Sequence, residues 1–269
     1  MSTKDWINKV IQGDCLELMK KLPDKSIDMI LCDLPYGITA NPWDKVIDFE
    51  NLWIQYRRII KENGAIVLTS QGLFTAKLIL SNPDWFKYKI VWIKSRATNY
   101  LNANKQLLRK HEDICVFYNK QPPYYPQRQD GNAYSRKRKQ QNTGSYGNYT
   151  VLNSTYTGGR YPTDVVCDGD TFMGDFVYCK TSESEGTVYH PNQKPVALGR
   201  YLIRTYTKPG AIVLDNACGS GSFLVAAIKE GRKFIGIELG TGSFRHKTEP
   251  IDFINVARQR VRKAMNEIR

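Results

Sequence analysis

Apolar and polar positions along the chain follow two rhythms. Short apolar runs with few charges are typical of strands buried on both faces, and they occur at residues 8–15, 29–32, 65–70, 88–94, 113–119, 211–215 and 233–238. Between these runs, apolar residues recur at helical spacing, in residues 16–22, 48–62, 73–80, 195–206, 223–231 and 251–265. Strands and helices in alternation predict an α/β fold, a doubly wound, mostly parallel, Rossmann-like sheet with helices on both faces.

Two of the predicted helices have clear apolar stripes. In residues 48–62 the stripe is followed by Asn63-Gly64, a pair that favours a left-handed helix stop; its members are Phe49, Leu52, Tyr56, Ile59 and Ile60. Residues 251–265 predict a basic amphipathic helix, with apolar positions at Ile251, Ile254, Val256, Val261 and Met265.

The pattern breaks between residues 122 and 189. This stretch is rich in Tyr, Gly, Asn, Ser, Thr, Lys and Arg and has few periodic apolar runs. It predicts a basic, loop-rich insertion, which we interpret as a variable target-recognition region between a catalytic half (1–121) and a cofactor-binding half (190–269).

The insertion carries a block of four basic residues, Arg136, Lys137, Arg138 and Lys139, with tyrosines on both sides. Basic residues interleaved with aromatic rings suit phosphate contacts combined with base stacking. The alternative is a surface loop with solvated charges. The charge of the whole chain favours nucleic acid, because 39 Lys and Arg against 26 Asp and Glu give a net charge of +13.

Composition narrows the class of protein further. The 269 residues are 41% hydrophobic, enough for one large α/β domain with a real core. The six cysteines contain no C-x-x-C pair, which predicts neither a zinc site nor a secreted disulfide framework. With no signal-peptide core and no membrane-length apolar run, we expect a cytoplasmic protein without a metal.

Residues 28–37, DMILCDLPYG, join a buried strand to a stiff turn. Asp33 follows the strand directly, at the edge where open α/β sheets place their ligands. Pro35 and Gly37 shape the loop and leave Tyr36 beside the acid. The alternative is an ordinary turn with Asp33 as its turn-forming residue.

Residues 211–238 form a second unit of strand, glycine loop, helix and strand. The first strand ends in Asp215, the loop contains Gly219 and Gly221, and the second strand ends in Glu238. Such a unit is typical of nucleoside binding, since glycine lets the backbone approach a ligand and a carboxylate accepts from ribose hydroxyls. Phe223 replaces the third glycine of a dinucleotide fingerprint, which favours a compact nucleoside with a charged tail.

Taken together, DLPYG, HPNQKP and LDNACGSGSF…GRKFIGIE resemble the amino-methylating DNA methyltransferases that use S-adenosylmethionine. Their catalytic motif is usually D-P-P-Y, S-P-P-Y or N-P-P-Y. Here the catalytic motif precedes the cofactor motif, an order that resembles the β group, and the likeness extends from Val10 to about Glu238. An Asp at the first motif position is most similar to the N6-adenine enzymes.

The resemblance implies catalytic roles for the D-L-P-Y motif. Asp33 and the carbonyl of Leu34 would accept hydrogen bonds from the target amino group, Pro35 would shape the loop, and Tyr36 would stack on the extruded base. Leu34 stands where the family usually has proline, and it serves if the loop keeps its path. Trp92 is a further candidate for the base pocket, although a Trp in the core of a strand is the more common case.

The resemblance also implies a cofactor site for S-adenosylmethionine. Asp14 would reach the adenine, Glu238 the ribose, and the glycine loop the methionine end. The HPNQKP segment would flank the methionine carboxylate. The full set is Asp14, His190, Lys194, Asp215, Gly219, Gly221 and Glu238. The polar stretch 239–250 predicts a loop.

The resemblance therefore predicts a site-specific adenine-N6 methyltransferase acting on double-stranded DNA. Alternatives are N4-cytosine methylation, a catalytically weak nucleic-acid-binding protein on the same scaffold, and methylation of RNA or protein. A homodimer and a restriction endonuclease partner are further expectations from the family.

Overall fold

The computed structural model describes residues 3–39, 41, 44–130, 134–136, 154–156, 159–168, 177–179, 182, 187–189, 193–242 and 251–268. The main sheet contains β1 (Lys9–Gln12), β2 (Ile27–Cys32), β3 (Ile60–Ser70), β4 (Phe86–Thr98), β5 (Arg109–Phe117), β10 (Val165–Asp168), β11 (Val177–Cys179), β12 (Ile212–Asp215) and β13 (Lys233–Glu238). Within the described residues these nine strands lie in the order β1-β13-β12-β2-β3-β5-β4-β10-β11.

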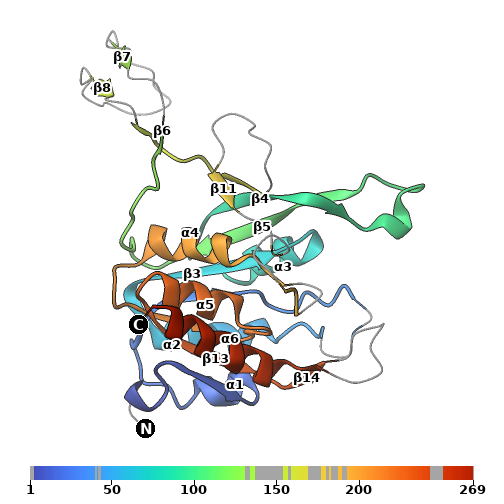
Figure 1. The fold of residues 1–269 in the computed structure, drawn as a ribbon, viewed down its shortest axis with the longest axis vertical. Coiled ribbons are helices and arrows are strands. Elements are labelled where there is room, and N and C mark those ends of the chain that lie inside the picture. The colour runs from blue at the N-terminus through green and yellow to red at the C-terminus, as the bar shows by residue number, and fades with distance from the viewer. Residues whose placement is uncertain are drawn as a thin grey trace.

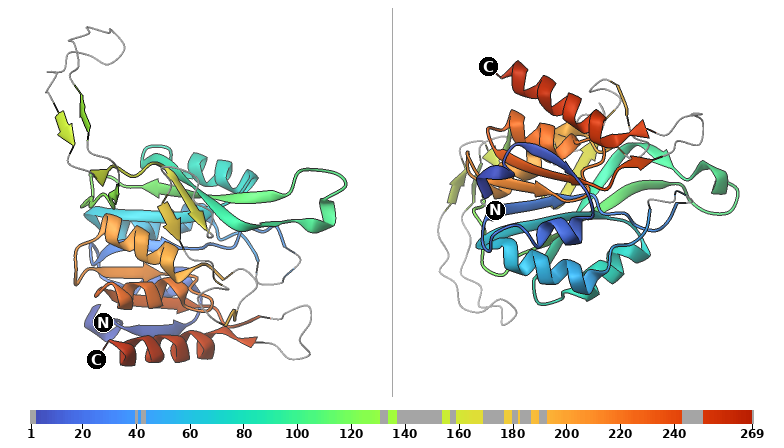
Figure 2. Two further views of the ribbon diagram at one scale, coloured as in Figure 1. Left: turned by 45° about the horizontal axis from the view of Figure 1, so that its top comes forward. Right: turned by 90° about the horizontal axis from the view of Figure 1, so that it is seen from below.

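Helices cover both faces of this sheet (Figures 1 and 2). They are α1 (Cys15–Met19), α2 (Phe49–Ile59), α3 (Leu73–Ser81), α4 (Val196–Tyr206), α5 (Ser222–Lys229) and α6 (Phe253–Glu267), with short 3-10 turns at Thr3–Asp5 and Tyr100–Asn102. The predicted α/β, doubly wound fold is confirmed.

Side chains of the central strands alternate between two cores. Met29 and Leu31 of β2 pack with α4, α5 and α6, whereas Ile30 and Cys32 pack with α1, α2 and α3. All four are fully buried. Because successive residues of a strand point to opposite faces, a continuous apolar run is what a strand covered on both sides requires.

Strand directions bring the motif ends together. β2 runs parallel to both of its neighbours, β12 and β3, and β12 runs parallel to β13. Their carboxyl ends therefore meet at one edge of the sheet. β5 is antiparallel to β3 and to β4, so the sheet is mixed on that side.

The predicted helix stop at Asn63-Gly64 is wrong. α2 ends at Ile59, and the extended residue Ile60 already begins β3. Gly64 has no positive φ. Instead, a Cβ at this position would lie 2.9 Å from the carbonyl oxygen of Asp28. Pairing with β2 overrides the local turn signal, with an irregular register between Ile27 and Met29.

The strand pair β4–β5 is longer than predicted and extends beyond the sheet as a two-stranded arm (Figure 1). β10, which starts at Val165, pairs with β4, so part of the predicted insertion belongs to the main sheet. Three smaller pairs complete the described structure: β6 (Gln129–Asp130) with β9 (Gly159–Arg160), β7 (Tyr134–Arg136) with β8 (Ser154–Tyr156), and β14 (Thr241–Gly242) with β15 (Ile251–Asp252). The three-part division of the chain stays a prediction.

Among the helices in the described part of the chain, none has the length and apolarity needed to cross a membrane. Four cysteines, Cys15, Cys32, Cys115 and Cys218, are free thiols. In the described ranges, no three acids, histidines or cysteines gather in a way that could hold a metal ion.

Candidate active site

A pocket of about 580 Å³ opens at the carboxyl edge of the sheet. Its volume is typical of a small-molecule or cofactor site. Residues from both halves of the chain line it, among them Asp33, Leu34, Pro35, Tyr36, Trp92, Glu112, Lys194, Asp215, Gly219 and Glu238. The catalytic and cofactor motifs, far apart in sequence, thus share one cavity.

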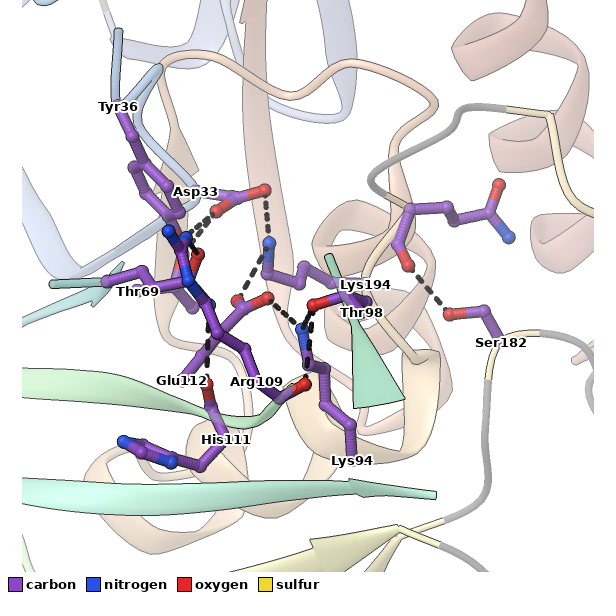
Figure 3. A network of polar contacts seen from close by, with 12 residues as sticks. Asp33, Tyr36, Thr69, Lys94, Thr98, Arg109, His111, Glu112, Ser182 and Lys194 are labelled. Carbon is purple, nitrogen blue, oxygen red and sulfur yellow. Dashed lines mark hydrogen bonds and ion pairs between the residues drawn. The ribbon is translucent and has the colours of Figure 1, made fainter. Parts of the chain in front are cut away.

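Asp33 follows the last residue of β2 and is held by three side chains (Figure 3). The Tyr36 hydroxyl donates to Asp33 Oδ1 at 2.8 Å, and the Thr69 hydroxyl donates to the same oxygen. Lys194 Nζ donates to Oδ2 at 2.7 Å. Because ordinary turns do not need such support, these contacts favour a functional carboxylate over a simple turn former.

The ammonium of Lys194 lies between two carboxylates. Its Nζ is 2.7 Å from Asp33 Oδ2 and 3.3 Å from Glu112 Oε2, and the side chain is only 7% exposed. Burial lowers the pKa of Lys194, but the two carboxylates outweigh it and raise the pKa above its ordinary value. Lys194 is therefore a cation in the pocket.

The loop after Asp33 is fixed by Asp44. Its carboxylate accepts hydrogen bonds from the backbone N–H groups of Gly37 at 2.8 Å, Ile38 at 3.0 Å and Thr39 at 2.7 Å. Gly37 adopts φ +68°, a conformation that favours glycine. The side chain of Leu34, in place of the usual proline, is buried in the core beneath the loop.

Tyr36 is positioned by its ring as well as by its hydroxyl. The ring lies 4.9 Å from that of Phe74, centroid to centroid. Burial, together with the Asp33 carboxylate, raises the pKa of Tyr36 well above its usual range. The phenol is therefore neutral and acts as a donor to Asp33.

The glycine loop joins β12 to α5. Gly219 and Gly221 have φ of +48° and +78°, which residues with a Cβ rarely adopt. The N–H of Gly219 donates to Glu238 Oε2 at 2.7 Å, and the N–H of Leu239 donates to Oε1 at 3.1 Å. Burial raises the pKa of Glu238, and it raises that of Asp215 to about 8.

This donor set fits S-adenosylmethionine. Glu238 lines the pocket beside the loop that contains Gly219 and Gly221, and Phe223, Leu239 and Phe253 add apolar walls. A nucleoside needs such an acid and such walls, and a charged amino-acid tail needs the polar groups on the Asp215 side.

Comparison with known proteins decides the family. A family described as DNA methylase matches residues 27–247, which is most of the chain. The chain belongs to this family. The amino-methylating type that the motifs predict is thereby confirmed.

Individual relatives are more distant. The type II methyltransferase M.HinfI of Haemophilus influenzae is 26% identical over 266 residues, which cover 87% of this chain and 65% of M.HinfI. The chain thus spans slightly less than two thirds of the length of that relative.

Solved structures share the fold of this chain. The crystal structure of an M1.HpyAVI–SAM complex is 22% identical and has a TM-score of 0.57, covering 94% of this chain and 98% of M1.HpyAVI. The cytosine-N4-specific PvuII DNA methyltransferase is 15% identical and has a TM-score of 0.60. The match covers 96% of this chain and 91% of the PvuII enzyme.

The structure does not bring every predicted site residue to the pocket. Asp14 caps α1 by accepting from the N–H groups of Leu16 at 2.8 Å and Glu17 at 3.1 Å, and it is not among the lining residues. It does follow β1, whose end pairs with Glu238. Trp92 is buried and lines the pocket, and its contact with a base stays a prediction.

The remaining predictions fall outside the described residues. His190 and Lys137 to Lys139 are not described. Of the loop predicted at 239–250, residues 243–250 are not described, and Thr241–Gly242 form β14. Arg136 is described only in its backbone, as the last residue of β7. Their roles stay predictions.

Several residues of the candidate site could not be found from the sequence patterns. Arg260 of α6 donates to the carbonyl oxygen of Ser220 at 2.7 Å and to the Ser222 hydroxyl at 3.1 Å, and so anchors the glycine loop. The Ser220 hydroxyl donates to Gln193 Oε1 at 3.1 Å, which ties that loop to the HPNQKP segment. Gln193 stands next to Lys194 in the HPNQKP segment, and its position there could have indicated this contact. For Arg260, one basic residue in a basic helix, no signal exists.

Proposed function

We propose that this protein is a site-specific DNA methyltransferase that moves a methyl group from S-adenosylmethionine to the exocyclic N6 of adenine in double-stranded DNA. The transfer is direct and in line, after the base has left the duplex. The observation that carries the proposal is that Asp33, Gly219 of the glycine loop and Glu238 of β13 line the same pocket.

Asp33 is the acceptor for the target amine. The lone pair of an aromatic amine is delocalised into the ring, which makes the nitrogen a poor nucleophile. Carboxylate and carbonyl oxygens around it favour tetrahedral geometry and stabilise the positive charge that develops there. The carbonyl of Leu34 is the second acceptor. Tyr36 and Thr69 fix the carboxylate before the base arrives, so little reorganisation is needed.

The base is held by aromatic contact. Tyr36 provides a ring at the pocket wall, backed by Phe74. Trp92 lines the same pocket from β4. Stacking on such rings stabilises a base outside the duplex by about 1–3 kcal/mol, which offsets part of the cost of unstacking it.

Cofactor binding is assigned to the other side of the pocket. Glu238 would hold the ribose hydroxyls, the N–H groups around Gly219 and Gly221 the methionine end, and Asp14 the adenine. When bound, S-adenosylmethionine supplies an electrophilic methyl group on a sulfonium. The protein contributes position: it holds the acceptor Asp33 and the cofactor loop on neighbouring strands.

The Asp at the first position of the D-L-P-Y motif favours adenine over cytosine, because this form of the motif is most similar to that of the N6-adenine enzymes. The fold does not choose between them, since the cytosine-N4-specific PvuII enzyme has a similar fold. N4-cytosine methylation is therefore the second candidate function.

Double-stranded DNA is the proposed partner, with the block from Arg136 to Lys139 as a phosphate-binding element. A homodimer and a restriction endonuclease partner remain predictions from the resemblance.

One experiment tests the proposal directly. Long unmethylated DNA of mixed sequence is incubated with the protein and isotope-labelled S-adenosylmethionine, digested to nucleosides and analysed by mass spectrometry. We expect labelled N6-methyladenine. Label on N4-methylcytosine would establish the second candidate, and DNA without label would refute both. Sequencing the same product would give the recognition site.

A further inference from the structure

Four charged side chains of alternating sign form a chain into the active site (Figure 3). Lys94 Nζ lies 2.9 Å from Glu112 Oε1, Glu112 Oε2 lies 3.3 Å from Lys194 Nζ, and Lys194 Nζ lies 2.7 Å from Asp33 Oδ2. The exposed fractions of the four side chains are 13%, 12%, 7% and 24% in this order. Only Asp33 has an assigned role in methyl transfer.

The contact between Lys194 and Asp33 creates an electrostatic problem. During transfer, positive charge develops on the amine nitrogen that Asp33 accepts. An ammonium at 2.7 Å from the same carboxylate weakens that acceptor and repels the new charge. In a partly buried site such a repulsion is screened much less than in bulk water. The Lys194 charge therefore opposes the reaction unless it is offset.

Glu112 is built to offset it. Lys94 fixes one carboxylate oxygen, and the other faces the Lys194 ammonium. Among the described residues, this second oxygen, Oε2, accepts no hydrogen bond and is buried. Burial raises the pKa of Glu112, but Lys194 and Lys94 outweigh this and lower the pKa below its usual value. Glu112 is therefore an anion in the pocket wall.

The strands explain why this arrangement is rigid. Lys94 lies on β4 and Glu112 on the adjacent β5, where Glu112 is paired with Trp92. The rings of Trp92 and Tyr36 flank the Lys194 ammonium, with centroids 6.0 and 5.6 Å from Nζ. The ammonium is thus enclosed by two carboxylates and two aromatic rings, and Glu112 is fixed within a strand.

We propose that Glu112 is a positioning residue for methyl transfer: it offsets the charge of Lys194, so that Asp33 keeps its full strength as an acceptor for the target amine. The inference rests on the proposed methyltransferase function and adds to it a residue outside both family motifs. With Lys94 included, the four charges sum to zero, and removing Glu112 alone leaves the site with one excess positive charge.

The test compares charge-changing variants in single turnover. Glu112→Gln keeps size and shape but leaves the excess positive charge, and we expect the methylation rate to fall about tenfold or more. Glu112→Asp keeps the charge and should recover most of the rate. Glu62→Gln, in the exposed Lys120–Glu62 pair near the start of β3 and away from the pocket, is the matched control and should keep the wild-type rate.

The double variant Lys94→Gln/Glu112→Gln separates charge balance from structural support. It restores a net charge of zero without touching Asp33 or Lys194. We expect it to be at least fivefold faster than Glu112→Gln. If Glu112 only supported the strand, losing both partners of the ion pair would make the double variant slower still. Melting temperature and the Kd for S-adenosylmethionine, measured by calorimetry, should stay close to wild type.

Two results would overturn the proposal: a Glu112→Gln rate within about twofold of wild type, or a double variant no faster than Glu112→Gln. If Glu112→Gln does not fold, the double variant alone decides. A rate within about fivefold of wild type would support the charge-balance role, and a larger loss at unchanged melting temperature would contradict it. The wild-type rate tests whether the protein methylates DNA at all. The rates of the variants relative to the wild type test the role of Glu112 separately.

Discussion

Asp33 and Lys194 are 161 residues apart in the chain, yet Lys194 Nζ donates to Asp33 Oδ2 at 2.7 Å. The carboxylate that we propose as the acceptor of the target amine is thus held by a residue two positions before α4, in the other half of the chain. Both side chains line the pocket shared by the catalytic and cofactor motifs. The predictions below test separate parts of that pocket.

Asp33→Ala should abolish methyl transfer, with a loss of about 10³-fold or more, because the main acceptor for the amine is gone. Cofactor binding, measured by calorimetry, should stay within about threefold of wild type, since Glu238 and the glycine loop are untouched. Asp24→Asn, at an exposed pair with Arg58, serves as the control. An active Asp33→Ala variant would sink the catalytic assignment.

Asp44→Asn should lower both stability and activity, because three backbone N–H groups of the catalytic loop lose a charged acceptor. We expect a loss of about 1–3 kcal/mol in the free energy of unfolding at pH 7. Burial raises the pKa of Asp44, but its hydrogen bonds from Thr39, Gly37 and Ile38 outweigh this and lower it.

The sign of this shift fixes the pH dependence of the Asp44→Asn effect. A lowered folded-state pKa stabilises the protein above the unfolded value, about 3.9, and this stabilisation is lost as the pH falls through the folded-state value. Denaturant unfolding at pH 7 and near pH 3 should therefore show a difference between wild type and variant that shrinks in acid. A difference independent of pH would contradict this account.

Asp14→Ser separates two roles of one carboxylate. Serine is also a good N-cap, so the stability of α1 should be kept, whereas Asp14→Ala should cost about 1 kcal/mol. If Asp14 also reaches the cofactor adenine, as the resemblance implies, Asp14→Ser should bind S-adenosylmethionine about tenfold more weakly. Calorimetry gives the Kd, and an unchanged value would show that Asp14 is only a cap.

Replacing Arg136 to Lys139 by alanine should weaken DNA binding and flatten its dependence on salt. Each lost phosphate contact reduces the slope of log K against log salt by about 0.9. The matched control is four exposed lysines near the amino ends of the strands, opposite the pocket: Lys9, Lys208, Lys229 and Lys233. Fluorescence anisotropy at several salt concentrations measures the slope. Equal slopes for both variants would refute a specific role of the block.

Much of the fold and site can be predicted from the sequence because its parts are local. Apolar runs predict the buried strands, and acids or glycines directly after them fall at one sheet edge. Asp33, Asp215, Gly219 and Glu238 therefore line one pocket, as strand order and direction require.

Glu112 could not be predicted in the same way. Its strand is visible from the apolar residues 114–117, but the charged stretch before them, 109–113, has no strand pattern. Its place beside Lys194 depends on β5 running antiparallel between β3 and β4, which no local pattern specifies. Gly64 illustrates the opposite error, in which a strong local signal yields to strand pairing.

The position of β1 has a consequence for synthesis of the protein. β1 pairs with β13, and β12 lies between β13 and β2, so the last strands of the main sheet to be translated fill the gap between the first two. A nascent chain that ends before residue 212 lacks β12 and β13, so no strand connects β1 to β2 and the rest of the sheet. A chain that stops before residue 212 therefore also lacks Asp215, Gly219 and Glu238, and with them one whole side of the pocket.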